Sequence, residues 1–367
     1  MPQNDFLAFA TGTGANVVSQ AQYASLPAVS QGFAPGLADA TQANKVWRQS
    51  SFVAAMIGEF IRQVGNLDAL DNSNLSQLQT NFIAALRLAG PRIPLLGPTS
   101  FYVDGASGND ASPGTSIAPW KTLAKAVTEL KSLDINNNPV SVYCSNAFST
   151  GLSITGPFQG AAAGGPQFIF QAGSSITDTT YNAIYVSEGA AITVSGPVVL
   201  TASNTSLQGG TGFPEYAGVG AGLYAVSGAV INVAGALNFS GCGTAHITAD
   251  TGIVRLDASY TISGNAPAHW NAARSGQIIV PLVLTGTNMI TVSLTGGSRT
   301  FATGFAVAAD TSVISVTSSV CQFSAPSGVV GARYNIASNA VIDTQASGAT
   351  FLPGNASGVT ATGGQYI

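Results

Sequence analysis

The order of apolar and polar residues divides the chain into two parts. Before about residue 95, apolar residues recur at steps of three, four and seven, the spacing of one face of an α-helix. Beyond residue 96 they form short alternating runs, which are typical of β-strands. Gly90-Pro91 and Gly97-Pro98 lie between the two patterns and predict a linker. We expect a partly helical domain over residues 1–95 and a β domain over residues 96–367.

Three helices follow from this pattern. The first begins after Asp39, which can cap it, and ends at Gly65-Asn66. Its apolar stripe suits packing against another helix and consists of Val46, Val53, Ile57, Phe60 and Val64. A second helix is expected over residues 75–88. A third is expected over residues 119–131, with Pro119 near its first turn, where proline is tolerated.

A loose repeat organises the β domain. A turn residue is followed by two small or apolar residues, an aliphatic residue, a polar residue and a second aliphatic residue. The first aliphatic positions are 23 to 39 residues apart and are Ile192, Ile231, Val254, Ile279, Ile314 and Ile342. One such unit cannot bury its apolar face alone, so the units are expected to stack as the coils of a β-solenoid. A sandwich or barrel would also have short strands and glycine-rich turns, but it does not predict the returning motif.

Composition excludes several classes of function. Charged residues make up 8% of the chain, against about 25% in ordinary soluble domains. Twelve Lys and Arg residues and a net charge of −4 are too few bases for nucleic-acid binding. No apolar run is long enough to predict membrane insertion, and residues 1–10 have no basic residue that would begin a secretory signal. The surface must instead be rich in Ser, Thr, Asn and Gln, which suits contact with sugars.

The cysteines and histidines predict neither a metal nor a cofactor. Cys144, Cys242 and Cys321 are far apart and lack metal-ligand spacing, so free, buried thiols are expected. Two histidines, His246 and His269, cannot form a three-histidine site within one chain. One histidine from each of three chains could still meet on a threefold axis.

Three segments resemble bacteriophage tail fibre and tailspike proteins. Residues 9–52, with Phe9-Ala-Thr-Gly-Thr-Gly and Asn44-Lys-Val-Trp-Arg-Gln-Ser-Ser-Phe, are similar to the virion-attachment segment of tail fibres. Tyr102-Val-Asp-Gly-Ala-Ser-Gly-Asn-Asp and Ala118-Pro-Trp-Lys-Thr-Leu-Ala-Lys-Ala resemble the segment that opens and caps the right-handed parallel β-helix of pectate-lyase-like tailspikes. Residues 352–366 are similar to the ends of some phage structural proteins.

The resemblance implies a homotrimer located in the virion and made in the cytoplasm of the host bacterium. Residues 1–95 would dock on phage tail proteins, and the β-helix would point outward to a host surface glycan. The apolar stripe after Asp39 could close a three-helix bundle around the threefold axis. A small spike, a fibre shaft and an adaptor for another fibre all remain open.

Candidate site residues fall in two places. The long excursion between Ile192 and Ile231 holds Phe213, Glu215, Tyr216 and Tyr224, whose rings could stack on sugars, although they could equally pack the loop on its coil. His269 and Trp270 follow Pro267 and are expected in a turn between coils, as sugar contacts or as a loop anchor. Hydrolysis would need two acids about 5–10 Å apart, for which Glu215, Asp250 and Asp257 are the weak candidates.

The sequence therefore favours a phage tail protein that binds surface polysaccharide without chemistry. The first alternative is a polysaccharide depolymerase, a hydrolase or lyase with carboxylates at coil or subunit boundaries. A secreted bacterial β-helix adhesin is a third interpretation.

Overall fold

The structure is a computed structural model, and it describes residues 2–36, 39–89, 92, 94–205, 219–281 and 289–367. It contains two compact units, residues 1–93 and residues 94–367. The division lies close to the predicted one between residues 95 and 96. Within the described residues, none of the helices combines the length and the apolar character that crossing a bilayer requires.

The first unit is helical where it has regular structure. Its elements are α1 (Gln20–Ser25), α2 (Ala28–Gln31), α3 (Ala40–Val64) and α4 (Leu75–Ala89). The Asp39 carboxylate caps α3 by accepting a hydrogen bond from the Thr41 backbone N–H (2.8 Å), as predicted. Ile61 is buried, and the rings of Phe60 and Phe82 join α3 to α4, with centroids 6.1 Å apart.

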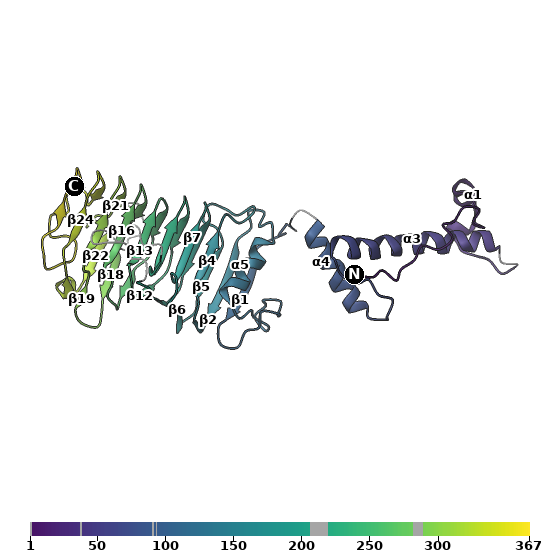
Figure 1. The fold of residues 1–367 in the computed structure, drawn as a ribbon, viewed down its shortest axis with the longest axis horizontal. Helices are drawn as coiled ribbons and strands as arrows, with labels where there is room; N and C mark the ends of the chain where they lie inside the picture. Colours follow the sequence, from purple (N-terminus) through teal and green to yellow (C-terminus); the bar gives the residue numbers. More distant parts are fainter. Residues whose placement is uncertain (1, 37–38, 90–91, 93, 206–218, 282–288) are drawn as a thin grey trace. The chain divides into compact units, whose positions relative to one another are not determined.

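The second unit is mainly β and has the architecture of a parallel β-solenoid (Figure 1). Its described strands form three long sheets and one strand pair, in which every pairing is parallel. The ten-stranded sheet contains β1 (Thr99–Asp104), β2 (Val140–Ser145), β5 (Gln167–Phe170), β8 (Ala191–Ser195), β11 (Val230–Val233), β14 (Ile253–Leu256), β17 (Gln277–Ile279), β21 (Val313–Ser315), β25 (Val341–Asp343) and β27 (Gln365–Tyr366).

The other sheets complete each coil. The eight-stranded sheet contains β4 (Leu152–Thr155), β7 (Ile184–Ser187), β10 (Leu223–Val226), β13 (Ala245–Asp250), β16 (Ala268–Ala273), β20 (Gly304–Ala308), β24 (Tyr334–Ile336) and β26 (Val359–Thr360). The seven-stranded sheet contains β3 (Ala147–Phe148), β6 (Ser174–Asp178), β9 (Val198–Ala202), β12 (Leu237–Cys242), β15 (Tyr260–Ile262), β18 (Ile290–Leu294) and β22 (Cys321–Ser324). β19 (Arg299–Thr300) pairs with β23 (Val329–Val330).

The predicted repeat corresponds to neighbouring strands of the ten-stranded sheet. Ile192, Ile231 and Val254 pair in register on β8, β11 and β14 and are fully buried. The prediction was wrong by one residue on β17, where Ile278, not Ile279, pairs with Val254. The reason is the preceding corner, at which Arg274 and Ser275 adopt the left-handed conformation and Gly276 does not.

Helix α5 (Leu123–Lys131) covers the first coil and contacts β1 and β4 (Figure 1). It buries Leu123, Ala126 and Leu130. The helix begins later than predicted, because Trp120 pairs with β1 in extended conformation and Thr122 provides the cap. Pro119 therefore precedes the helix and is not in its first turn.

Candidate functional site

The structure brings together only part of the predicted site. Phe213, Glu215 and Tyr216 lie outside the described residues. Tyr224 on β10 and Asp250 on β13 are neighbours in the eight-stranded sheet and share a hydrogen bond (2.9 Å). Asp257 is exposed and follows β14, so it lies at the other end of this strand from Asp250.

Asp250 is held in a buried cluster. Its carboxylate is fully buried, forms an ion pair with Arg274 and accepts the hydrogen bond from the Tyr224 hydroxyl. Burial, and then the Asp250 charge, raise the pKa of Tyr224. A carboxylate that is 0% exposed cannot come within hydrogen-bond reach of a substrate. Tyr224 is only 4% exposed, so neither residue offers the open glycan contact or the catalytic acid that the sequence suggested.

The expectation for His269 and Trp270 was wrong. Both lie in β16 rather than in a turn, and both side chains are 0% exposed. They stack among the rings of Phe301 and Phe305 in the core. Neither can contact a sugar from this position. His246 is equally buried, so a histidine site on a threefold axis is also excluded.

The two histidines belong to a buried hydrogen-bond chain. The Ser240 carbonyl can only accept, so His246 donates to it through Nε2 (3.0 Å) and presents an unprotonated Nδ1. His269 therefore donates its Nδ1–H to His246 Nδ1 (3.0 Å). The Tyr260 hydroxyl donates to His269 Nε2 (2.7 Å) and accepts from Trp270 Nε1 (3.1 Å). Every group in the chain is satisfied only while both imidazoles are neutral.

A solvent-accessible hollow that carries aromatic side chains lies on the outer face of β4 and β7 in the second unit. We call it the tyrosine groove, a cavity of about 540 Å³. Ser153 and Tyr185 pair across β4 and β7 and form its floor. The remaining described lining residues are Asp178 at the end of β6 and residues of the adjoining turns, namely Ser149, Thr150, Gly151, Thr180, Tyr181, Asn182 and Val219.

Asp178 builds the turn that carries Tyr181. Its Oδ1 accepts hydrogen bonds from the backbone N–H groups of Thr180 (2.8 Å) and Tyr181 (2.6 Å). Its Oδ2 accepts from the Gly151 N–H of the preceding coil (2.7 Å). A side chain at Gly151 would lie 2.1 Å from the Asn182 carbonyl oxygen, so this close approach requires glycine. The acid is therefore a structural anchor.

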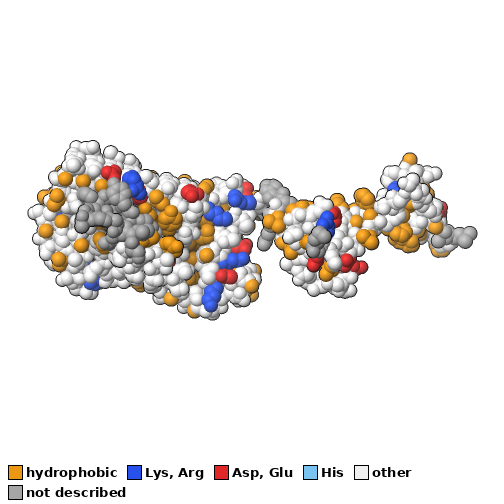
Figure 2. Space-filling model, in the orientation of Figure 1, with side chains coloured by type: hydrophobic (Ala, Val, Ile, Leu, Met, Phe, Trp, Pro, Cys, Tyr) orange, Lys and Arg blue, Asp and Glu red, His pale blue; other side chains and the backbone are white. Residues whose placement is uncertain are grey.

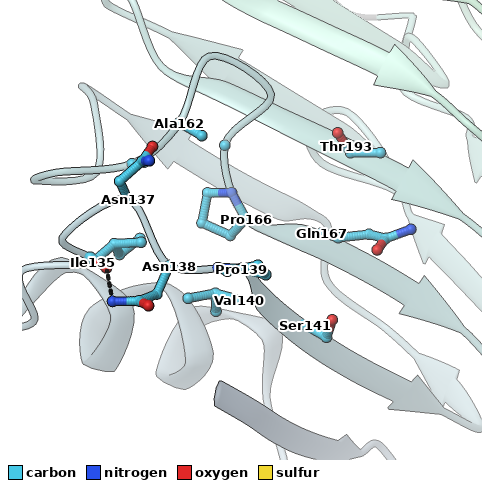
Figure 3. Close-up of a pocket in the computed structure, with 12 residues that line it drawn as sticks. Ile135, Asn137, Asn138, Pro139, Val140, Ser141, Ala162, Pro166, Gln167 and Thr193 are labelled. Atoms are coloured by element: carbon cyan, nitrogen blue, oxygen red, sulfur yellow. Dashed lines mark hydrogen bonds between the residues drawn. The ribbon is translucent and has the colours of Figure 1, made fainter. Parts of the chain in front are cut away.

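A second hollow, of about 320 Å³, lies over β2, β5 and β8 (Figure 3). Figure 3 places Asn137 and Asn138 on one side and Gln167 and Thr193 on the other. Asn138 donates to the Leu95 (2.8 Å) and Ile135 (3.2 Å) carbonyls, and Gln167 donates to Ser195 (3.1 Å). Its described lining contains no titratable side chain, so this hollow can bind polar groups but cannot transfer protons.

Sequence reasoning missed Tyr181 and Tyr185. The available signal was Asp178-Thr-Thr-Tyr181, because an aspartate before a turn can cap two following N–H groups and fix an aromatic residue at the tip.

The thiols were predicted correctly, since Cys144, Cys242 and Cys321 are free and buried. Burial raises the pKa of Cys242 and of Cys321 to about 12 in each case, so neither is a nucleophile. Among the described residues, no group of three His, Cys, Asp or Glu could hold a metal ion.

Comparisons with known proteins provide no family for this chain. No protein-family model matches it, and a search of curated proteins found no match. A crystal structure of a GH136 lacto-N-biosidase from Eubacterium ramulus aligns over 88% of this chain and 73% of its own, at 9% identity and a TM-score of 0.18. A TM-score this low indicates neither a shared fold nor a shared activity.

Proposed function

We propose that this chain is a structural protein of a phage tail, a fibre or spike, that attaches the virion to its host by binding bacterial surface polysaccharide. Residues 94–367 would form a right-handed β-helix that presents the glycan contact. Residues 1–93 would dock on the phage tail, and three chains would associate. The virion location rests on the resemblance of residues 9–52 and 102–126 to tail fibre and tailspike segments.

The tyrosine groove is the observation that carries the glycan-binding proposal. It combines two tyrosine rings with serine and threonine hydroxyls, the groups that meet the apolar faces and the hydroxyls of sugars. Glycoside hydrolysis needs two carboxyl groups in defined positions. The groove's described lining has a single acid, Asp178, which already accepts three backbone hydrogen bonds. Binding without cleavage is the function that suits this arrangement.

The low surface charge supports the same proposal. No Lys or Arg occurs between Ser132 and Val254, and Figure 2 shows that charged side chains are sparse on the visible face of the described β-solenoid. A surface of neutral polar groups can exchange hydrogen bonds with a hydrated polysaccharide without burying unpaired charges.

Two measurements on the full chain test the proposal. Light scattering is expected to give a solution mass near three chains. Incubation with a panel of purified bacterial surface polysaccharides is expected to show binding of at least one of them. Size-exclusion chromatography is expected to show that the size distribution of the bound polysaccharide does not change during the incubation. A stable monomer would contradict the trimeric fibre. Shortening of a bound polysaccharide would replace the binding function with a depolymerase, and Asp257→Asn would be the first variant to test for lost cleavage.

A further inference from the structure

We propose that the tyrosine groove is a subsite for an uncharged pyranose unit and discriminates against acidic sugars. This inference rests on the proposed glycan-binding function and adds the chemical class of the ligand. It follows from three features of the groove: the placement of its rings, its unused hydroxyls and the sign of its charge.

The backbone turn of Tyr181 and the ring of Tyr185 are both held by neighbouring residues. Tyr181 is 64% exposed, and the hydrogen bond from its backbone N–H to Asp178 (2.6 Å) fixes its turn. Its carbonyl also accepts the Gly220 N–H of the next coil (2.9 Å). Tyr185 is half-buried on β7 and packs against Tyr224, with centroids 5.6 Å apart. Because Tyr224 is anchored on Asp250, the Tyr185 ring has a rigid support, and little ordering is needed when a sugar binds.

The hydroxyls around the rings are available to a ligand. The side chains of Ser149, Thr150, Ser153 and Thr180 line the groove and form no hydrogen bond with another described residue. Each hydroxyl can donate one hydrogen bond and accept others, as a sugar hydroxyl also does. The cavity of about 540 Å³ is large enough for a small organic ligand rather than an ion, since such pockets measure roughly 300–1,000 Å³.

The charge of the groove selects against acidic sugars. Asp178 is negative, and the described lining contains no Lys, Arg or His that could pair with a carboxylate of the ligand. A uronic acid bound there would bring a second negative charge near Asp178 without a cation. Like charges in a partly desolvated site repel each other, so an uncharged sugar binds better.

Calorimetric titration of the full chain tests this assignment. The probes are neutral hexose tetrasaccharides, a tetramer of N-acetylglucosamine and tetragalacturonate, each added to the wild type and to three variants. At least one neutral probe is expected to bind and tetragalacturonate is not. Tyr181→Ala is expected to weaken binding about tenfold by loss of ring stacking, whereas Tyr181→Phe retains binding. Tyr102→Ala, which removes a tyrosine stacked on Tyr143 of the ten-stranded sheet, is the matched control and retains binding.

The outcomes separate this inference from the proposed function. Equal binding by wild type and Tyr181→Ala, tighter binding of tetragalacturonate, or binding of none of the neutral probes would overturn the assignment of the groove. The glycan-binding function survives any of these results if the chain still binds a bacterial polysaccharide. If the chain binds no polysaccharide of either charge class, the proposed function fails as well.

Discussion

At the scale of single residues, the buried histidine pair makes stability depend on pH. Burial lowers the pKa of His246 to about 3 and places that of His269 well below its ordinary value. In the unfolded chain both would titrate near 6.5. The unfolded state therefore binds more protons below pH 6.5, so stability is full above that pH and is lost as the pH falls toward 3.

The expected loss can be measured. Between pH 6.5 and pH 5, protonation of each histidine in the unfolded state lowers the free energy of unfolding by about 2 kcal/mol. Ordinary carboxylates stay ionised over this pH range. Denaturant unfolding at several pH values checks this, and the His246→Gln/His269→Gln double variant is the control. The free energy of unfolding of this variant is expected to be lower than that of the wild type at pH 7 but nearly independent of pH between pH 6.5 and 5. An equally steep slope in the variant would show that other groups titrate.

Asp178 provides a second prediction at this scale. Asp178→Asn keeps an acceptor for Thr180 and Tyr181 but turns an N–H donor toward the Gly151 N–H. We expect a loss of about 1–3 kcal/mol in unfolding free energy, measured by chemical denaturation. The same substitution at exposed Asp257 should change it little. An equal loss of unfolding free energy in the Asp178 and Asp257 variants would mean that the hydrogen bonds of Asp178 make no specific contribution to stability.

The sequence could not reveal these residue-scale features. His269 follows Gly264-Asn265 and Pro267, which resemble turn residues, yet it lies in a six-residue strand. Its partner His246 is on the adjacent strand, one coil earlier, and only the stacking register brings their Nδ1 atoms together. The sequence alone does not distinguish a polar residue that is buried beside such a partner from one that is exposed to solvent.

At the scale of elements, glycines at the corners set how closely successive coils stack. A Cβ at Gly276 would lie 2.0 Å from the Ala249 carbonyl oxygen, a backbone atom that cannot rotate away. Gly276→Ala is expected to cost about 1–3 kcal/mol or more by forcing the corner before β17 away from β13. Gly241→Ala is the matched control, since a Cβ there meets nothing within 4 Å. Thermal unfolding of the two variants compares them, and equal midpoints would refute the steric argument.

The elements were more predictable than their registers. Helix α3 follows from an apolar stripe and a capping aspartate, which are local signals, and the solenoid follows from the returning aliphatic positions. The one-residue error at β17 arose because its corner uses Arg274 and Ser275 in the left-handed conformation without glycine. The predicted repeat treats Gly276 as the turn residue, but this glycine follows the corner, and the predicted register is therefore shifted by one residue.

At the scale of the whole molecule, the repeat in the sequence directly implies a continuous buried column of aliphatic side chains. Each coil contacts its neighbours, and the buried column of Ile192, Ile231, Val254 and Ile278 is continuous through the ten-stranded sheet. Alternation then leaves the intervening side chains, such as Thr193, Asn232 and Arg255, pointing outward. The tyrosine groove depends on segments of successive coils that meet above β4 and β7, and such a juxtaposition cannot be predicted from one repeat alone.

The proposed trimer gives the last prediction. Phe52, Val53 and Met56 lie close together on α3, and each is more than half exposed in the single chain. Burying such a stripe between three helices would remove apolar surface from water, which is favourable by about 25 cal/mol per Å². Met56→Glu places a charge in that stripe and is expected to reduce the solution mass from three chains to one, measured by light scattering.

The matched control is Ile117→Glu, because Ile117 is even more exposed but belongs to the second unit. Circular dichroism should show unchanged β content in both variants. A trimeric Met56→Glu variant would exclude this stripe as the association surface and direct attention to the outer faces of the sheets.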